Sequence, residues 1–217
     1  MKRNKKIFLS AVCLLVAFIL WTVAISFIDV KAIGPNNSEV GFATLNKVIH
    51  DFIGTNMDLY IITDWLGLIP FAFAVVFGII GLVQWIKRKH FLKVDHSILV
   101  LGGFYLVVIL VYILFENLII NYRPVLIDGF LEISYPSSTT LLVVCVMPTT
   151  ILQFNSRIKN KVVKIVVSSI LTGFTSFMVI GRLISGVHWF TDIVGAGLLS
   201  GGLVMLYCFF TKIIQKC

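Results

Sequence analysis

Long apolar runs separated by short polar segments constrain this chain more than any other feature. Six runs of roughly twenty residues contain few or no charges, and a run of this length is what an α-helix needs to cross a bilayer. The mean hydropathy of +1.01, with 59% hydrophobic residues, exceeds that of soluble domains. The predicted spans are about Ile7–Phe27, Tyr60–Ile86, Ile98–Phe115, Ser138–Phe154, Ile165–Ile184 and Trp189–Thr211. We therefore predict an all-α protein, a six-span transmembrane helical bundle that forms one membrane-embedded domain over residues 1–217.

The first apolar run admits two interpretations, a retained anchor or a cleaved signal peptide. A basic start precedes it, as in signal peptides: Lys2, Arg3, Lys5 and Lys6. However, the run is about twenty residues long and ends at Ser26–Asp29 without an Ala-x-Ala-like cleavage site. We therefore interpret it as the first span.

Basic residues orient the bundle. The N-terminus, the loops after the second and fourth spans, and the C-terminal tail hold most of the 18 Lys and Arg residues. By the positive-inside rule these segments face the cytoplasm, so both termini are cytoplasmic and the number of spans is even. Lys31, Lys47, Arg123 and Arg182 then lie outside, with all acidic residues except Asp95. The sequence thus predicts a multi-pass plasma-membrane protein whose motif residues face outside.

Charge and cysteine content exclude several classes of function. The net charge of +8 follows from the topogenic basic residues, so we expect contact with the lipid bilayer and no nucleic-acid partner. Cys13, Cys145 and Cys208 fall within spans and Cys217 at the cytoplasmic end, which predicts neither a disulfide nor a metal site. The long outer segment, residues 29–58, contains an amphipathic stretch at Phe42–Phe52 that fits either the bilayer surface or a cover over a pocket.

Three short polar pieces fall at the predicted outer ends of the spans. They are Arg123-Pro124 after the third span, Pro136-Ser137-Ser138-Thr139-Thr140 at the start of the fourth, and Arg182, His188 and Asp192 around the start of the sixth. Ionisable residues at a membrane are costly unless paired, so they are functional candidates by default. Because all three pieces lie on one side, we expect them to share a polar pocket.

The residue types in these pieces fit phosphate chemistry. A guanidinium is planar and permanently charged, so Arg123 and Arg182 together suit a phosphate monoester or a diphosphate. The free backbone N–H groups at the start of the fourth span, with the hydroxyls of Ser137, Ser138 and Thr139, favour an anion. Taken singly, the same features fit a snorkelling arginine and an ordinary Ser/Thr helix cap. Their combination favours a phosphate site.

His188 and Asp192 form the candidate reactive pair. If the sixth helix has already begun at His188, the two side chains share a face, and the carboxylate can accept a hydrogen bond from one imidazole nitrogen. The other nitrogen is then free for attack, which follows the logic of a catalytic triad without its serine. Taken alone, the pair equally fits an ion pair that anchors the helix.

Together the three pieces resemble the signatures of the type 2 phosphatidic acid phosphatase superfamily. The set Arg182-x5-His188-x3-Asp192 is similar to the third signature, Arg123-Pro124 to the end of the first (Lys, six residues, Arg-Pro), and Tyr135-Pro136-Ser137-Ser138 to the start of the second (Pro-Ser-Gly-His). The likeness covers roughly Phe115 to the C-terminus. It implies a cofactor-free, metal-independent lipid phosphatase in which His188 is the nucleophile.

The chain departs from these signatures at several positions. Glu116 replaces the lysine of the first signature, Ser138 and Thr139 replace the glycine and histidine of the second, and Gly181 replaces the serine of the third. In the family that histidine is the general acid, and a threonine hydroxyl is too weak an acid to replace it. Loss of a general acid costs roughly 10²–10⁴-fold in rate. If Glu116 faces the pocket, the charge of the pocket is two units more negative than it would be with a lysine at this position.

Three functions fit this pattern. The first is hydrolysis of an outward-facing polyprenyl diphosphate or related lipid phosphate, favoured because a phosphate leaving group needs less protonation than an alkoxide. The second is a catalytically silent protein that binds or transports a lipid phosphate, which the replacements at Thr139 and Glu116 favour. The third is a lipid phosphotransferase, which differs only in its acceptor. The retained Arg, His and Asp set favours an enzyme, since binding alone needs no nucleophile.

Overall fold

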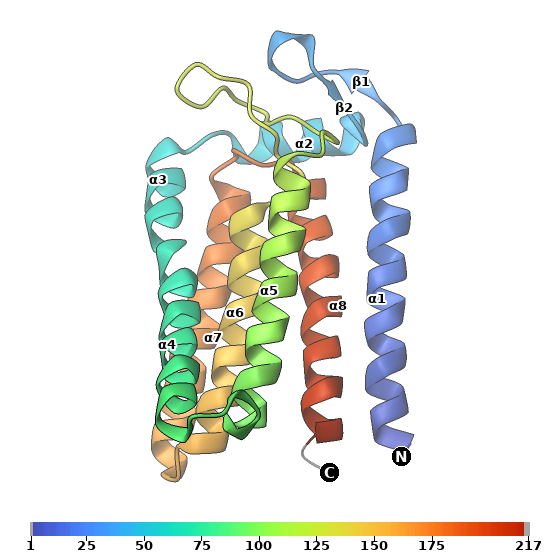
Figure 1. Ribbon diagram of the computed structural model, residues 1–217. Helices are drawn as coiled ribbons and strands as arrows, with labels where there is room; N and C mark the ends of the chain where they lie inside the picture. Colours follow the sequence, from blue (N-terminus) through green and yellow to red (C-terminus); the bar gives the residue numbers. More distant parts are fainter. Residues whose placement is uncertain (1, 215–217) are drawn as a thin grey trace.

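The computed structural model describes residues 2–214, which form a bundle of long helices (Figure 1). Six helical segments are long and apolar enough to cross a membrane. They are α1 (Lys2–Phe27), α3 with α4 (Met57–Leu66 and Leu68–Arg88), α5 (His96–Glu116), α6 (Ser138–Arg157), α7 (Lys161–Ile184) and α8 (Phe190–Ile214). The prediction of an all-α, six-span protein is confirmed, with each span ending within a few residues of its expected bounds.

The second span is broken where a single helix was expected. α3 ends at Leu66 and α4 begins at Leu68, with Gly67 between them. Pro70 explains the break, because proline has no N–H to donate to the carbonyl of Leu66. The break separates a short helix, α3, which packs against α7, from the longer α4. As a result, α3 supplies polar side chains to the end of the bundle where α2 lies.

α6 forms the centre of the bundle. It contacts α4, α5, α7 and α8, and about half of its residues are buried. Its buried face includes Leu141, Cys145 and Thr149. The enclosure of α6 fixes the position of its first turn, which carries the Ser137–Thr140 piece.

α1 packs along α8 at close range (Figure 1). Phe18 and Ile25 are buried, and a Cβ at Gly202 would lie 2.7 Å from Leu15 Cδ2. The side chain of Trp21 donates a hydrogen bond to the carbonyl of Thr191, at 3.1 Å. These contacts favour the interpretation of the first apolar run as a retained anchor.

The remaining elements lie at the two ends of the bundle (Figure 1). At one end are β1 (Lys31–Ala32) and β2 (Glu39–Val40), which pair antiparallel, η1 (Pro35–Asn37) and α2 (Ala43–Ile53). At the other end are η2 (Phe91–Lys93), the start of α1 and the end of α8. Cys13, Cys145 and Cys208 carry free thiols, whereas Lys216 and Cys217 lie outside the described residues.

Candidate active site

The three polar pieces meet at the α2 end of the bundle. Arg123 comes from the α5–α6 loop, Arg182 from the last turn of α7, and His188 from the loop before α8. Arg182 is 1% exposed, His188 3% and Asp192 0%, so all three ionisable side chains are buried. The expectation that the pieces share one site agrees with this geometry.

His188 is held with one ring nitrogen facing both arginines. Its Nδ1 lies 3.1 Å from the carbonyl oxygen of Ser134, which can only accept, so Nδ1 carries the proton. Nε2 lies 3.3 Å from Nη1 of Arg123 and 3.4 Å from Nη2 of Arg182. Guanidinium groups only donate, so both contacts place N–H groups against the lone pair of Nε2. Nε2 of His188 therefore lies at the point where the two guanidinium groups converge.

The imidazole is kept neutral. Burial, and then the charges of Arg123 and Arg182, lower the pKa of His188 well below its ordinary value of 6.5. A neutral ring near neutral pH has the free lone pair that attack on phosphorus requires.

Asp192 supports His188 less directly than expected. α8 begins at Phe190, so His188 precedes the helix and the two residues do not share a helical face. Oδ2 of Asp192 lies 3.7 Å from Nδ1 of His188 and accepts a hydrogen bond from the N–H of Trp189 at 2.9 Å. A carboxylate in the first turn of a helix that bonds the preceding N–H caps the helix. Asp192 thus fixes the turn that carries His188, while Ser134 is the hydrogen-bond partner of the ring.

Arg182 spans the site from α3 to His188. Its Nη1 lies 3.4 Å from Oγ1 of Thr63 and 3.5 Å from Oδ1 of Asp64. Its guanidinium carbon also lies 4.9 Å from the centre of the Tyr60 ring, within the range of a cation–π contact. Three side chains of α3 therefore hold this arginine.

Arg123 has the same two kinds of contact as Arg182, one with a carboxylate and one with the ring of Tyr60. Its Nε lies 3.0 Å from Oε2 of Glu132, an ion pair without an aligned hydrogen bond. Its guanidinium carbon lies 5.8 Å from the centre of the same Tyr60 ring. Each arginine thus has one partly exposed carboxylate partner, Glu132 or Asp64. An incoming anion would compete with these carboxylates for the two guanidinium groups.

The start of α6 contributes less free backbone than the sequence predicted. The N–H of Ser137 donates to the carbonyl oxygen of Asp192 at 3.3 Å, so it is not available to an anion. Within residues 2–214, no backbone acceptor is paired with the N–H groups of Ser138 and Thr139, as expected for a first helical turn. The hydroxyl of Ser137 is buried without a hydrogen-bond partner. The helix start remains able to donate to an anion through Ser138 and Thr139.

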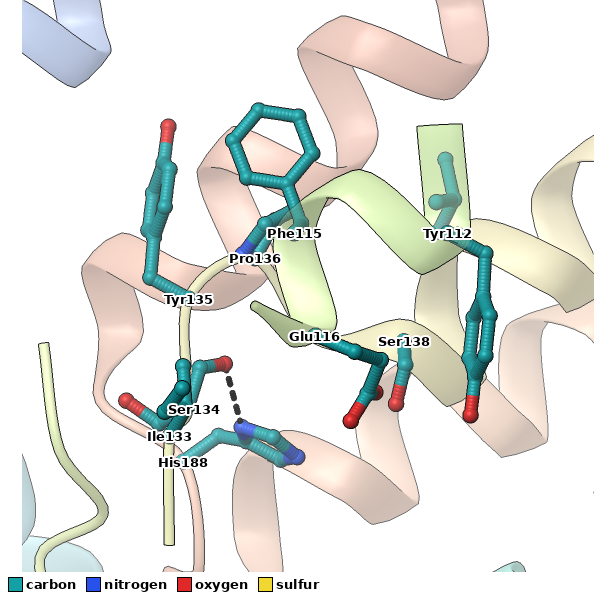
Figure 2. Close-up of a pocket in the computed structure, with 10 residues that line it drawn as sticks. Tyr112, Phe115, Glu116, Ile133, Ser134, Tyr135, Pro136, Ser138 and His188 are labelled. Atoms are coloured by element: carbon teal, nitrogen blue, oxygen red, sulfur yellow. Dashed lines mark hydrogen bonds between the residues drawn. The ribbon is translucent and has the colours of Figure 1, made fainter. Parts of the chain in front are cut away.

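A small pocket adjoins the His188 ring, and Glu116 faces into it. The side chains of Glu116, Ser138 and Tyr112 point into the cavity that His188 borders (Figure 2). Thr139 is not among its lining residues. The methyl group of Thr139 instead faces Gly67, 3.4 Å from where a Cβ would stand on that residue.

Several site residues were missed by the sequence reasoning. Tyr60, Thr63 and Asp64 lie on α3, and Glu132 and Ser134 in the α5–α6 loop. Asp64 carried the one available signal, a carboxylate inside a predicted span. Ser134 acts through its backbone carbonyl. Every residue has such a group, so the residue type at this position gives no signal for the role.

Comparison with known proteins supports the fold. Neither a protein-family model nor a curated protein matches the sequence. Among solved structures, the chain resembles a transmembrane PAP2-type phosphatidylglycerolphosphate phosphatase from Bacillus subtilis, with a TM-score of 0.55 and 21% sequence identity. The match covers 94% of this chain and 97% of that one, so it includes the half before Phe115 that the signatures do not reach. The chain therefore shares the fold of that transmembrane phosphatase, with six helices long and apolar enough to cross a membrane.

Proposed function

We propose that the protein is a metal-independent lipid phosphate phosphatase that works through a phosphohistidine at His188. The observation that carries this proposal is the convergence of Arg123 and Arg182 on Nε2 of His188, at 3.3 and 3.4 Å. Two guanidinium groups beside an unprotonated nitrogen can hold phosphoryl oxygens while that nitrogen attacks phosphorus. The substrate class is an outward-facing polyprenyl diphosphate or a related lipid phosphate.

The reaction consists of two displacements at phosphorus. In the first, the lone pair of Nε2 forms an N–P bond and the P–O bond to the leaving group breaks. For a diphosphate the attack is on the terminal phosphorus, and the leaving group is the lipid monophosphate. In the second, the oxygen of a water molecule bonds phosphorus, the P–N bond breaks and Nε2 regains its lone pair. The protons of that water leave with the inorganic phosphate or pass to solvent. Arg123 and Arg182, with the N–H groups of Ser138 and Thr139, stabilise the oxygens in both steps.

The pocket favours diphosphates over monophosphates. Protonation of a poor alkoxide leaving group needs a general acid of suitable pKa. The residue at the family's acid position is Thr139, whose hydroxyl cannot fill that role. A lipid monophosphate leaves readily without protonation, so the absence of imidazole at residue 139 costs least for a diphosphate substrate.

A phosphate-release assay tests the proposal. The purified protein is incubated with a panel of lipid mono- and diphosphates in detergent, with a chelator present. We expect release of inorganic phosphate, faster from the diphosphates and insensitive to the chelator. Release that depends on added divalent metal would contradict the proposed mechanism, and no release from any substrate would contradict enzymatic activity.

A lipid-phosphate-binding protein without turnover is the second candidate. It is favoured by Glu116, whose carboxylate faces the cavity beside His188 and opposes a bound anion (Figure 2). Binding of a lipid diphosphate without phosphate release, in the same assay, would support this candidate.

Reversal of the charge at residue 116 is expected to strengthen phosphate binding. Glu116→Lys removes a repulsive charge from the pocket and adds an attractive one, so KM should fall by about 3- to 10-fold at low salt. Glu116→Gln removes only the repulsion and should give a smaller decrease. The control is Asp128→Asn, which removes a charge from an exposed position in the α5–α6 loop that follows Glu116 and should leave KM unchanged. An unchanged KM for both Glu116 variants would contradict a role for this carboxylate in substrate binding.

The proposed orientation predicts which loops can be labelled from outside intact cells. In a protein whose native cysteines are replaced by alanine, Phe130→Cys should react with a membrane-impermeant maleimide, because Phe130 is 73% exposed at the α2 end. Lys159→Cys, in the exposed α6–α7 loop, should react only after permeabilisation. The opposite pattern would place the candidate site in the cytoplasm.

A further inference from the structure

Two buried asparagines connect the outer segment, residues 29–56, to the first turn of α8. Asn46 lies on α2 and Asn121 in the α5–α6 loop, and the two side chains are 0% and 1% exposed. Both bond the peptide groups of Gly41: its N–H donates to Oδ1 of Asn121 at 3.2 Å, and its carbonyl accepts from Nδ2 of Asn46 at 2.8 Å. The two side chains are therefore fixed by the same short piece of backbone.

The other ends of these amides bond α8. Oδ1 of Asn46 accepts from the N–H of Thr191 at 3.2 Å, and its Nδ2 donates to Oγ1 of Thr191 at 3.0 Å. Nδ2 of Asn121 lies 3.4 Å from Oδ1 of Asp192. Thr191 and Asp192 are themselves fully buried. Asn46 thus supplies the cap that the first turn of α8 needs, and Asn121 holds the carboxylate beside His188.

Asn121 also reaches His188 through its backbone. Its carbonyl accepts from the N–H of Ser134 at 2.9 Å, and the carbonyl of Ser134 accepts from Nδ1 of His188 at 3.1 Å. Asn121 therefore supports both groups that lie near Nδ1 of His188, the carbonyl of Ser134 and the carboxylate of Asp192.

Close backbone contacts fasten the segment at two more points. A Cβ at Gly41 would lie 1.7 Å from the carbonyl oxygen of Ile25, and one at Gly186 would lie 2.0 Å from that of Gly54. Gly186 also has a φ of +67°, and the N–H of Asn56 donates to the carbonyl of Ser185 at 2.9 Å. The segment is therefore packed onto the turn that carries His188 rather than lying free above it.

We propose that Asn46 and Asn121 are positioning residues that hold the first turn of α8, and with it His188, in register for attack on phosphorus. This inference rests on the proposed phosphatase function and assigns the outer segment to the active-site scaffold. A buried amide that loses its partner leaves unsatisfied groups on both sides, so the turn shifts when either side chain is truncated. A misplacement of about 1 Å can cost about 10²-fold in rate.

A double-mutant cycle tests whether Asn121 acts through Asp192. Asn121→Ala should lower kcat by about 10- to 100-fold while KM changes by less than about threefold, because the substrate-holding arginines are untouched. In an Asp192→Ala background, the same substitution should lower the residual rate by less than about twofold. Asn117→Ala, at an exposed position in the same loop, is the control and should behave as wild type. Multiplicative losses in the double variant would overturn the proposal.

Hydrogen exchange tests the link without using activity. Asn46→Ala removes the acceptor of the Thr191 N–H, so the peptide that contains the start of α8 should exchange about fivefold faster. Lys47→Ala, an exposed neighbour on the same helix, should leave the exchange unchanged. Unchanged exchange in Asn46→Ala would overturn the proposal whatever the activity. An inactive wild type with faster exchange in Asn46→Ala would instead overturn the proposed function and leave the link between the segment and α8 supported.

Discussion

His188→Ala is expected to abolish phosphate release from every lipid phosphate that the wild-type protein hydrolyses. The substitution deletes the nitrogen to which we assign the bond to phosphorus, and no other imidazole takes its place between the two guanidinium groups. Loss of a nucleophile of this kind lowers kcat by about 10⁴-fold or more, because the remaining site contributes only binding and charge stabilisation. The measurement is phosphate release over long incubation, together with trapping of an acid-labile phosphoenzyme in the wild type.

Two variants make this result specific. Asp192→Asn should retain a weak rate, because the amide oxygen can still accept from the N–H of Trp189 and keep the turn capped. His96→Ala, at an exposed position on the opposite end of α5, should keep the wild-type rate. Equal hydrolysis by His188→Ala and the wild type would exclude a histidine nucleophile at this position.

The spans were predictable because the thickness of the bilayer sets the length of an apolar run. Hydropathy therefore located all six spans, but it did not show the break at Gly67, since the residues on either side of it, Leu66 and Leu68, are both apolar. Pro70 carried the signal for that break, because it cannot complete the helical hydrogen bond to Leu66. The position of α3 depends on this break, and so do its contacts with Arg182.

Within the site, side chains that are costly in a membrane were the ones that could be predicted. Arg123, Arg182 and His188 stand out in an apolar sequence, and the structure brings them together. The supporting residues could not be predicted, for physical reasons. Asparagines in polar segments have many ordinary roles, so the roles of Asn46 on α2 and Asn121 in the α5–α6 loop follow only from their long-range contacts.

The shared helical face predicted for His188 and Asp192 was conditional on a helix that had already begun at His188. With α8 starting at Phe190, the carboxylate of Asp192 satisfies the backbone of the turn instead. The imidazole then bonds a carbonyl from the α5–α6 loop. Both arrangements orient the ring, but only the observed one makes the α5–α6 loop part of the site.

Arg182→Lys is expected to lower kcat/KM by about 10²–10³-fold, comparable to the loss of one oxyanion-stabilising donor in other enzymes. Arg182 reaches Thr63 and Asp64 with one terminal nitrogen and His188 with the other. A lysine ammonium is a single point charge without the planar fork, so it cannot bond α3 and the phosphoryl oxygens together. The measurement is kcat and KM on a matched lipid mono- and diphosphate pair, with the thermal stability of each variant.

Thermal stability distinguishes a structural role of Arg182, in packing, from its proposed role in the reaction. At 1% exposure, a shorter cation also loses its packing against Tyr60, so some decrease in Tm is expected. Arg88→Lys is the matched control, because Arg88 forms an exposed ion pair with Asp95 at the opposite end of the bundle, and such pairs contribute little. If Arg182→Lys lowers Tm but leaves kcat/KM intact, then Arg182 only fastens α3 to α7. A fall in kcat/KM at temperatures well below Tm would instead support a role of its guanidinium in the reaction, through His188 or through the phosphoryl group.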